Sequence, residues 1–285
     1  MKKMISLLLA SLFVIAAFAG CAATPSAPSS QPAASSSEAV SSEAEPVETL
    51  PADLQAIVDA GVLKVGTKID VPNFGYTNPD TNVTEGMEID VVKLIAKDLL
   101  GDENAYAVQG VTAATRGPLI DNSEVDFVIA TFTITEERKL SWNFTRPYYT
   151  DEIGFLVKKD AGYTDIASLS GKTIGVAQSA TTKAAIEELA TEKGISFKFS
   201  EFASYPDLKT ALTSSRIDAF SVDKSILRGY LDDSTVILDE GFKPQNYGIA
   251  SKLDKTDLAA YLDGFISKIE ADGTLSEIIS KWNLG

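Results

Sequence analysis

The chain contains no histidine and only one cysteine among its 285 residues. Without histidine, catalytic triads of the Ser-His or Cys-His kind are excluded, and a single cysteine cannot form an internal disulfide. Positive charge is also scarce, because 40 acidic residues outnumber 25 basic ones and the formal net charge is −15. A net charge of this sign opposes binding to nucleic acid or to anionic lipid head groups. An anionic ligand would therefore need a local cluster of cations.

The N-terminus has the pattern of a targeting segment. Two lysines precede an apolar run from Ile5 to Phe18, which is too short to span a membrane comfortably. Ala19-Gly20-Cys21 follows and resembles a lipobox, although Phe18 stands where leucine is usual. We expect residues 1–21 to be a lipoprotein signal peptide, with a lipid anchor at Cys21 that holds the protein to the cell membrane. The alternative is an ordinary secretory signal with an incidental cysteine.

The rest of the chain divides into a low-complexity segment and a globular body. Residues 22–49 consist mainly of Ala, Ser, Pro and Glu, with too few large apolar side chains to form a core, so they are predicted to be a disordered tether. From residue 53 onward, short apolar strands alternate with amphipathic helices in two similar sets. This alternation predicts the α/β fold class and suggests two lobes.

The most informative stretch is residues 129–138. An apolar, strand-like run ends there in hydroxyl-bearing residues, and Thr133 and Glu136 have the spacing of a helix capping box. A helix N-terminus offers backbone N–H groups to an anion, and Arg138 adds a planar fork that pairs with a carboxylate. These features suit a small carboxylate ligand. An ordinary capped helix with a solvated arginine would show the same local pattern.

The longer segment from Asp126 to Arg138 resembles the signature of the extracellular polar-amino-acid-binding proteins of ABC importers, solute-binding protein family 3. The resemblance implies a two-lobe periplasmic-binding-protein fold of type II, in which the chain crosses between the lobes twice. Lobe 1 is then expected to comprise residues 53–152 plus 248–285, and lobe 2 residues 153–247. The crossings are expected near Thr150–Gly154 and Tyr247–Ala250.

The resemblance also implies a set of ligand contacts. Thr131 and Thr133 are expected to contact the amino-acid head group, and Arg138 to bind its carboxylate. Asp223 ends an apolar strand, where it can pair with an ammonium group or, alternatively, cap the helix that follows. Thr181 and Thr182 are expected to close on the carboxylate from lobe 2 or simply to cap a helix, although Ala180 replaces the glycine usual in the family.

Three further residues bear on the ligand's side chain. Lys68, Arg116 and Tyr205 resemble positions of the aspartate/glutamate-binding branch, where they hold a second carboxylate; solvated cations at loop tips are the alternative. Three cations and the single carboxylate of Asp223 leave two positive charges for a ligand of net charge −1. The expected ligand-binding residues are Lys68, Arg116, Thr131, Phe132, Thr133, Arg138, Thr181, Thr182, Tyr205 and Asp223.

The resemblance therefore predicts an extracytoplasmic, monomeric protein that captures L-glutamate or L-aspartate and delivers it to the permease of an ABC importer. No catalytic residue, cofactor or metal is expected, and no nucleic-acid partner. Three alternatives remain open: an enzyme of dehydratase type on the same fold, a ligand-sensing module, and a binder of another polar amino acid such as glutamine.

Overall fold

A computed structural model describes residues 50–285 of the chain. The expected signal peptide, the anchor at Cys21 and the tether over residues 22–49 all lie outside this part. Within residues 50–285, no helix is long and apolar enough to cross a membrane.

The first lobe is built on a five-stranded mixed sheet. Strand β1 lies between β5 and β6 and runs parallel to both, whereas β14 runs antiparallel to β6 and β7. The spatial order is β5 (Tyr106–Gly110), β1 (Leu63–Thr67), β6 (Phe127–Ile129), β14 (Ala250–Lys252) and β7 (Trp142–Phe144). The last of these strands in the sequence, β14, thus comes from the C-terminal part of the chain.

The second lobe has its own sheet. Strands β9, β10 and β11 are parallel, and β8 joins β11 in antiparallel orientation. The order is β10 (Lys198–Phe202), β9 (Thr173–Ala177), β11 (Ala219–Asp223), β8 (Tyr149–Lys158) and β12 (Thr235–Ile237), and β13 (Phe242–Tyr247) pairs with the first half of β8.

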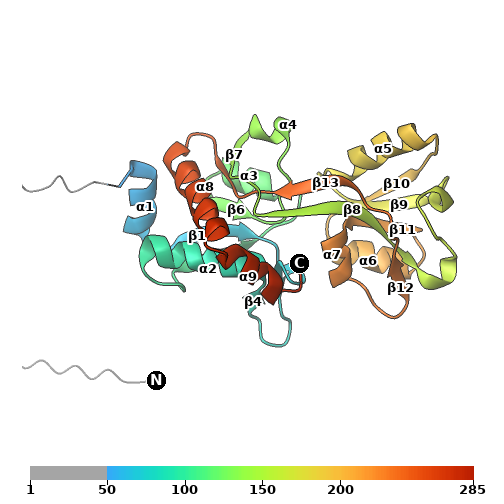
Figure 1. Cartoon of the computed structure of the whole chain (residues 1–285), viewed down its shortest axis with the longest axis horizontal. Coiled ribbons are helices and arrows are strands. Elements are labelled where there is room, and N and C mark those ends of the chain that lie inside the picture. Colours follow the sequence, from blue (N-terminus) through green and yellow to red (C-terminus); the bar gives the residue numbers. More distant parts are fainter. Residues whose placement is uncertain (1–49) are drawn as a thin grey trace, which may run out of the picture. The chain divides into compact units, whose positions relative to one another are not determined.

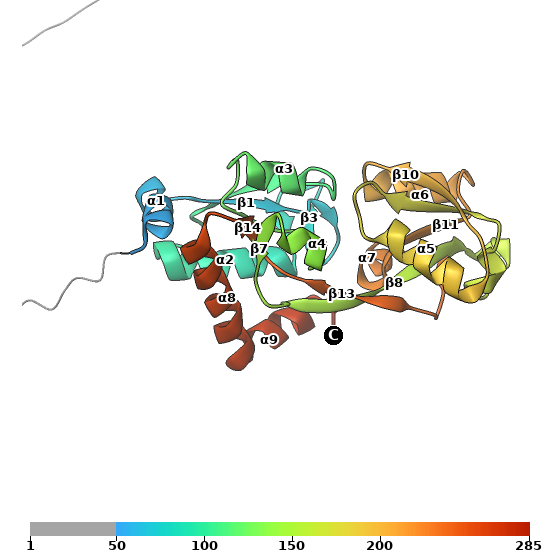
Figure 2. The ribbon, with the colours of Figure 1, turned by 90° about the horizontal axis from the view of Figure 1, so that it is seen from above.

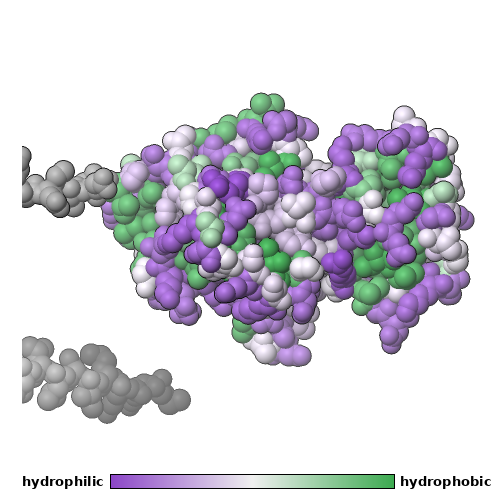
Figure 3. All heavy atoms as spheres, viewed as in Figure 1, coloured by the Kyte–Doolittle hydropathy of each residue, from purple (hydrophilic) through white to green (hydrophobic). Residues whose placement is uncertain are grey.

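Helices and short elements cover both sheets. The first lobe carries α1 (Ala52–Ala60), α2 (Met87–Leu100), α3 (Arg116–Asp121), α4 (Glu136–Lys139), α8 (Thr256–Ala271), α9 (Thr274–Lys281) and a small sheet of β2 (Asp70–Val71), β3 (Gly75–Thr77) and β4 (Thr84–Glu85). The second carries α5 (Thr182–Lys193), α6 (Tyr205–Thr213), α7 (Lys224–Gly229) and the 3₁₀ turns Lys159–Ala161 and Ala167–Leu169. Figure 3 shows hydrophilic residues over much of one face of the molecule, with smaller hydrophobic areas between them.

Two antiparallel strands join the lobes. Strand β8 leaves the first lobe and continues into the second sheet, and β13 runs back beside it before the chain enters β14 (Figures 1 and 2). Their register pairs Tyr149 with Tyr247 and Ile153 with Phe242. The expected two-lobe α/β fold with two crossing segments is therefore confirmed. The lobe boundaries at residues 152/153 and 247/248 stay a prediction.

The sequence explains where helix α1 ends and which side of helix α2 is buried. Helix α1 ends at Gly61, whose φ of 64° lies in the left-handed region and whose N–H donates to the carbonyls of Ile57 and Val58. Only glycine adopts this conformation without a steric penalty from Cβ. The apolar side of α2, with Val91, Val92 and Ile95 fully buried, packs into the core beneath the first sheet.

Candidate functional site

The expected site residues follow the carboxyl ends of neighbouring parallel strands. Lys68 follows β1 and Thr131 follows β6 in the first sheet, whereas Asp223 ends β11 in the second. Because parallel strands end at the same edge of a sheet, each lobe gathers its polar residues at one edge, which is where ligands bind in open α/β sheets. The two edges face each other closely enough for side chains of the two lobes to touch.

The helix after β6 begins two residues later than the capping box predicts. Thr133 forms an isolated β-bridge with Tyr247, so its backbone is still extended. Helix α4 begins at Glu136, and its N-cap is Thr135, whose Oγ1 accepts a hydrogen bond from the Arg138 N–H at 3.1 Å. The predicted Thr133–Glu136 capping box is therefore wrong, and Thr133 keeps its hydroxyl for another partner.

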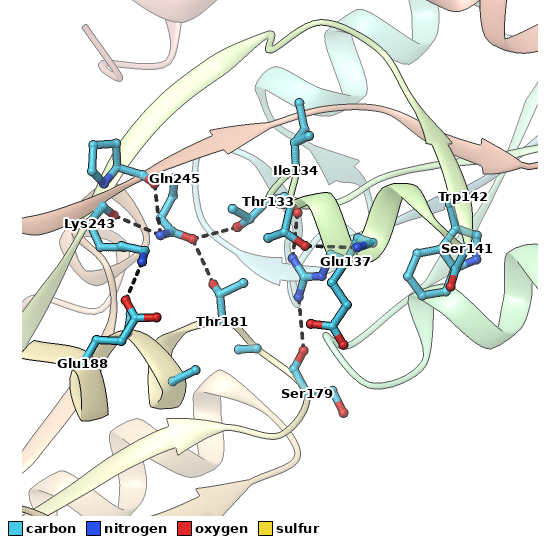
Figure 4. Close-up of a pocket in the computed structure, with 16 residues that line it drawn as sticks. Thr133, Ile134, Glu137, Ser141, Trp142, Ser179, Thr181, Glu188, Lys243 and Gln245 are labelled. Atoms are coloured by element: carbon cyan, nitrogen blue, oxygen red, sulfur yellow. Dashed lines mark hydrogen bonds and ion pairs between the residues drawn. The ribbon is translucent and has the colours of Figure 1, made fainter.

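Arg138 lies between the lobes. One guanidinium nitrogen donates to the carbonyl of Thr133 at 2.7 Å, and the other donates to the carbonyl of Ser179 in the second lobe at 3.3 Å. Burial, followed by the nearby charge of Arg116, lowers the pKa of Arg138 to about 9, so it remains charged at neutral pH. Arg138 lines a cavity of about 560 Å³ that residues of both lobes and of β13 surround (Figure 4).

Arg116 is buried beside the same loop. Its guanidinium donates to the carbonyls of Ala130 at 2.8 Å and Thr131 at 3.1 Å, and it lies 3.8 Å from the ring centroid of Phe132. The Arg138 guanidinium lies 4.8 Å from the same centroid, so Phe132 lies against both arginines. The Nε of Arg116 has no hydrogen-bond partner among the described residues. Arg116 thus supports the loop after β6 and keeps one donor available.

Lys68 already has a counter-ion. Its ammonium pairs with Asp70 at 2.9 Å and donates to the carbonyl of Val111 at 3.2 Å. It also lies 4.6 Å from the ring centroid of Tyr205, which belongs to α6 in the other lobe. Burial lowers the pKa of Lys68, although Asp70 opposes that effect. The sequence-based charge count treated Lys68 as an uncompensated cation, and that premise is wrong because β2 turns Asp70 back onto it.

Glu88 is a site residue that the sequence analysis missed. It is fully buried on α2, and its Oε1 accepts hydrogen bonds from the Thr131 N–H and the Tyr148 hydroxyl, both at 2.6 Å. Thr131 has a φ of 45°, a left-handed conformation that is strained for a β-branched residue, and the Glu88 contact holds it there. Burial raises the pKa of Glu88 to about 7. In the sequence, Glu88 is one acidic residue beside the apolar residues of a helix, and no local pattern indicates that it binds the loop after β6.

The sequence leaves open that Asp223 caps the helix that follows it, but the structure does not show this cap. Its side chain makes no capping hydrogen bond to α7; Asp151 instead accepts from the Ser225 N–H at 3.0 Å. The Asp223 carboxylate accepts a hydrogen bond from the Tyr247 hydroxyl. Burial, with a contribution from Asp151, raises the pKa of Asp223 to about 7. This buried carboxylate at the strand end suits a cationic partner.

The hydroxyls of Thr133 and Thr181 share one acceptor. Each donates to the Oε1 of Gln245 at 2.9 Å, so a residue of β13 bridges the first and second lobes (Figure 4). Thr182 is buried at the start of α5 beside them. Gln245 was not singled out from the sequence, because a glutamine in a polar strand has no distinctive pattern.

The charges of the side chains at the two facing edges cancel only when Glu88 and Asp223, whose pKa values are raised to about 7, are both ionised. Three cations contribute to the site, namely Lys68, Arg116 and Arg138. Three carboxylates balance them when all are ionised, namely Asp70, Glu88 and Asp223. The sequence-based count of two surplus positive charges omitted Asp70 and Glu88. When these two carboxylates are included, no surplus positive charge remains. Within residues 50–285, no cluster of three or more Asp, Glu, His or Cys side chains has the arrangement of a metal site.

One family model matches most of the chain. The family model of the bacterial extracellular solute-binding proteins, family 3, matches residues 63–285. The chain is 34% identical over 285 residues to the ABC transporter glutamine-binding protein GlnH of Bacillus subtilis (strain 168), covering 99% of this chain and 97% of that protein. It is 30% identical over 243 residues to the glutamate-binding protein GluB of Corynebacterium glutamicum, covering 81% of each.

A solved structure shows the same fold. An ancestral arginine-binding protein bound to glutamine superposes with a TM-score of 0.70 at 28% identity, covering 79% of this chain and 99% of that one. The likeness extends over nearly the whole of that protein, and therefore over both lobes and the strands between them.

Proposed function

The chain belongs to the bacterial extracellular solute-binding proteins of family 3, which bind amino acids for ABC transporters, and we propose that its ligand is L-glutamine, with L-glutamate as the second candidate. The observation that carries the choice is the cancelling set of three cations and three carboxylates at the facing edges of the lobes. A site without surplus charge favours a zwitterion of net charge zero over a ligand of net charge −1.

The proposed head-group contacts use the charged residues that reach both edges. Arg138 binds the α-carboxylate, and Asp223 binds the α-ammonium from the other lobe. Thr131 Oγ1 and Arg116 Nε are buried without a partner in the part of the chain that the structure describes. Buried polar atoms are normally paired, so these two are natural ligand contacts. Thr133, Thr181 and Thr182 complete the head-group site, with the ring of Phe132 as its apolar wall.

The side-chain pocket is proposed to lie between Lys68, Arg116 and Tyr205. The Lys68–Asp70 pair offers both a donor and an acceptor, which matches the two ends of a carboxamide. A second carboxylate would instead have to compete with Asp70 for the ammonium. This geometry supports glutamine.

Glutamate remains the second candidate because one carboxyl group of the site is easily neutralised. The pKa of Glu88 is about 7, and its protonation would leave one surplus positive charge. A relative named for glutamate binding also lies within the family matches. The sequence-based preference for glutamate or aspartate thus stays a prediction.

Isothermal titration calorimetry of the full chain against the twenty amino acids tests the proposal. We expect L-glutamine to bind most tightly at pH 8, with L-glutamate at least about tenfold weaker, because an uncompensated charge brought into a buried site costs more than one tenfold step in affinity. Tighter binding of glutamate than of glutamine at pH 8 would make the acidic assignment correct. Binding of none of the twenty would remove the amino-acid assignment altogether.

Anchoring and delivery complete the proposal. The protein closes its two lobes over the amino acid by a hinge at β8 and β13, contains no chemical step, and presents the closed form to the ABC permease. A lipid at Cys21 holds it to the membrane.

Replacement of Cys21 by serine tests the anchor. We expect Cys21→Ser to leave the protein in the soluble fraction of cells that carry the parent protein in the membrane fraction, because no thiol remains to be lipidated. Membrane fractionation followed by mass spectrometry of the N-terminal peptide provides the measurement. Equal fractionation of variant and parent, with the same lipid mass, would contradict the anchor.

A further inference from the structure

Gln245 lies on β13, the strand that returns from the second lobe to the first. Just before it the pairing of β13 with β8 shifts register between Phe242 and Pro244, and Lys243 adopts a φ of 51°. This irregularity re-aims the strand. The Gln245 side chain consequently points inward and is only 2% exposed, although Lys243, Pro244 and Asn246 around it are exposed.

The carboxamide of Gln245 uses all of its usual hydrogen-bonding capacity. Its Oε1 accepts from the Thr133 hydroxyl in the first lobe and from the Thr181 hydroxyl in the second, both at 2.9 Å. Its Nε2 donates to the carbonyls of Lys243 at 2.9 Å and Pro244 at 3.2 Å, which fixes the orientation of the amide. Figure 4 shows the oxygen between the two threonines and the nitrogen facing back along its own strand.

The hydrogen bonds that Thr133 and Thr181 donate to Gln245 exclude hydrogen bonds from the same hydroxyls to a ligand. A threonine hydroxyl has one proton to donate. While Thr133 and Thr181 donate to Gln245, neither can donate to the carboxylate of an amino acid. Two of the hydroxyls that the head-group site would offer are therefore occupied by a side chain of the protein itself.

We propose that Gln245 is an internal competitor for the ligand: its carboxamide holds the two lobes together through Thr133 and Thr181, and the α-carboxylate of an incoming amino acid displaces it. This inference rests on the proposed amino-acid function and adds a regulatory contact to it. A carboxylate is a stronger acceptor than an amide, so the exchange favours the ligand. The contact nevertheless stabilises the closed form without ligand. It lowers the apparent affinity in proportion to the fraction of protein in which Gln245 occupies both hydroxyls.

Two variants separate competition from structural support. Gln245→Met keeps length and volume but removes the acceptor, and water can satisfy the carbonyls of the exposed Lys243 and Pro244. Gln245→Glu places a stronger acceptor at the same point. We expect Gln245→Met to bind L-glutamine about 3- to 10-fold more tightly than the parent, the range for one net hydrogen bond, and Gln245→Glu to bind it at least about tenfold more weakly.

A second measurement needs no ligand. Hydrogen exchange of the ligand-free full chain, followed by mass spectrometry, should show faster exchange in Gln245→Met than in the parent for peptides covering residues 131–140 and 177–185. Gln109→Met, at an exposed glutamine of β5, is the matched control and should change neither exchange nor affinity.

Different results would overturn the proposed amino-acid binding and the proposed role of Gln245. If the parent binds none of the twenty amino acids, the proposed function fails. If the parent binds glutamine but Gln245→Met binds it equally or more weakly, or if exchange in the ligand-free protein is unchanged, the competitor role of Gln245 is overturned and the residue is a structural part of the hinge.

Discussion

At the scale of single residues, the buried carboxyl group of Glu88 ties stability to pH. Burial raises its pKa from 4.5 to about 7, so between these values the folded state binds more protons than the unfolded state. The contribution of Glu88 to stability is therefore fully present below about pH 4.5 and is lost as pH rises through about 7. A shift of this size corresponds to a loss of about 3 kcal/mol.

Replacing Glu88 by glutamine should remove much of that pH dependence. Glutamine keeps an oxygen for the Thr131 N–H and the Tyr148 hydroxyl but does not ionise. We expect the parent to lose more stability than Glu88→Gln between pH 5 and pH 8, measured by urea unfolding at each pH. Glu103→Gln, at an exposed position, should behave like the parent. A pH profile of Glu88→Gln that parallels the parent would show that Glu88 does not carry the linkage.

A second residue-scale prediction concerns selectivity. Asp70 neutralises Lys68 at 2.9 Å, so Asp70→Asn leaves the ammonium uncompensated. We expect the ratio of glutamate to glutamine affinity to rise at least about tenfold, because one charge-assisted hydrogen bond contributes about 1.5–3 kcal/mol. Calorimetric titration of both ligands provides the ratio, with Asp80→Asn at an exposed position as the control. A ratio that stays constant or moves toward glutamine would place the ligand's side chain away from Lys68.

At the scale of elements, sequence patterns identified the strand and the helix around the signature but not the residue that joins them. Both Thr133 and Thr135 stand before Glu136, and the capping-box spacing favours Thr133. That residue is kept extended by its bridge to Tyr247, more than a hundred positions later in the chain. Local propensity cannot register such a pairing. The contacts of Glu88 with Thr131 and of Gln245 with Thr181 were missed for the same reason.

The observed cap of α4 gives an element-scale prediction. Thr135→Ala removes the oxygen that accepts from the Arg138 N–H, and loss of such a cap costs about 1 kcal/mol. Because Arg138 belongs to this short helix, binding of glutamine should weaken as well. Urea unfolding and calorimetry measure the two effects, and Thr135→Ser, which retains the oxygen, should restore most of both. Unchanged stability in Thr135→Ala would mean that packing alone holds α4.

At the scale of the whole molecule, the alternation of strands and helices was enough to predict an α/β fold with two lobes. The return of the chain through β13 into β14 was not visible in that pattern and came from the family resemblance. The reason is physical: β14 pairs with β6 and β7, strands more than a hundred residues earlier, and nothing in its three residues specifies those partners. The tether and anchor expected before residue 50 stay predictions.

The last prediction couples ligand, stability and pH in the whole molecule. A ligand that binds only the folded protein stabilises it by about 2.7 kcal/mol at one hundred times its dissociation constant. In a domain of this size, that is a rise in Tm of roughly 5–10 °C. We expect L-glutamine to produce this rise at pH 8, where Asp223 is ionised.

At pH 5.5 the rise should be much smaller. The pKa of Asp223 is about 7 without ligand. The ammonium of glutamine must then displace a proton, which lowers the apparent affinity by roughly 30-fold and removes about 2 kcal/mol of the stabilisation. Differential scanning calorimetry of the full chain at the two pH values, with the same glutamine concentration and with D-glutamine as the control solute, measures the difference. Equal rises in Tm at pH 5.5 and pH 8 would show that the ammonium is bound elsewhere than at Asp223.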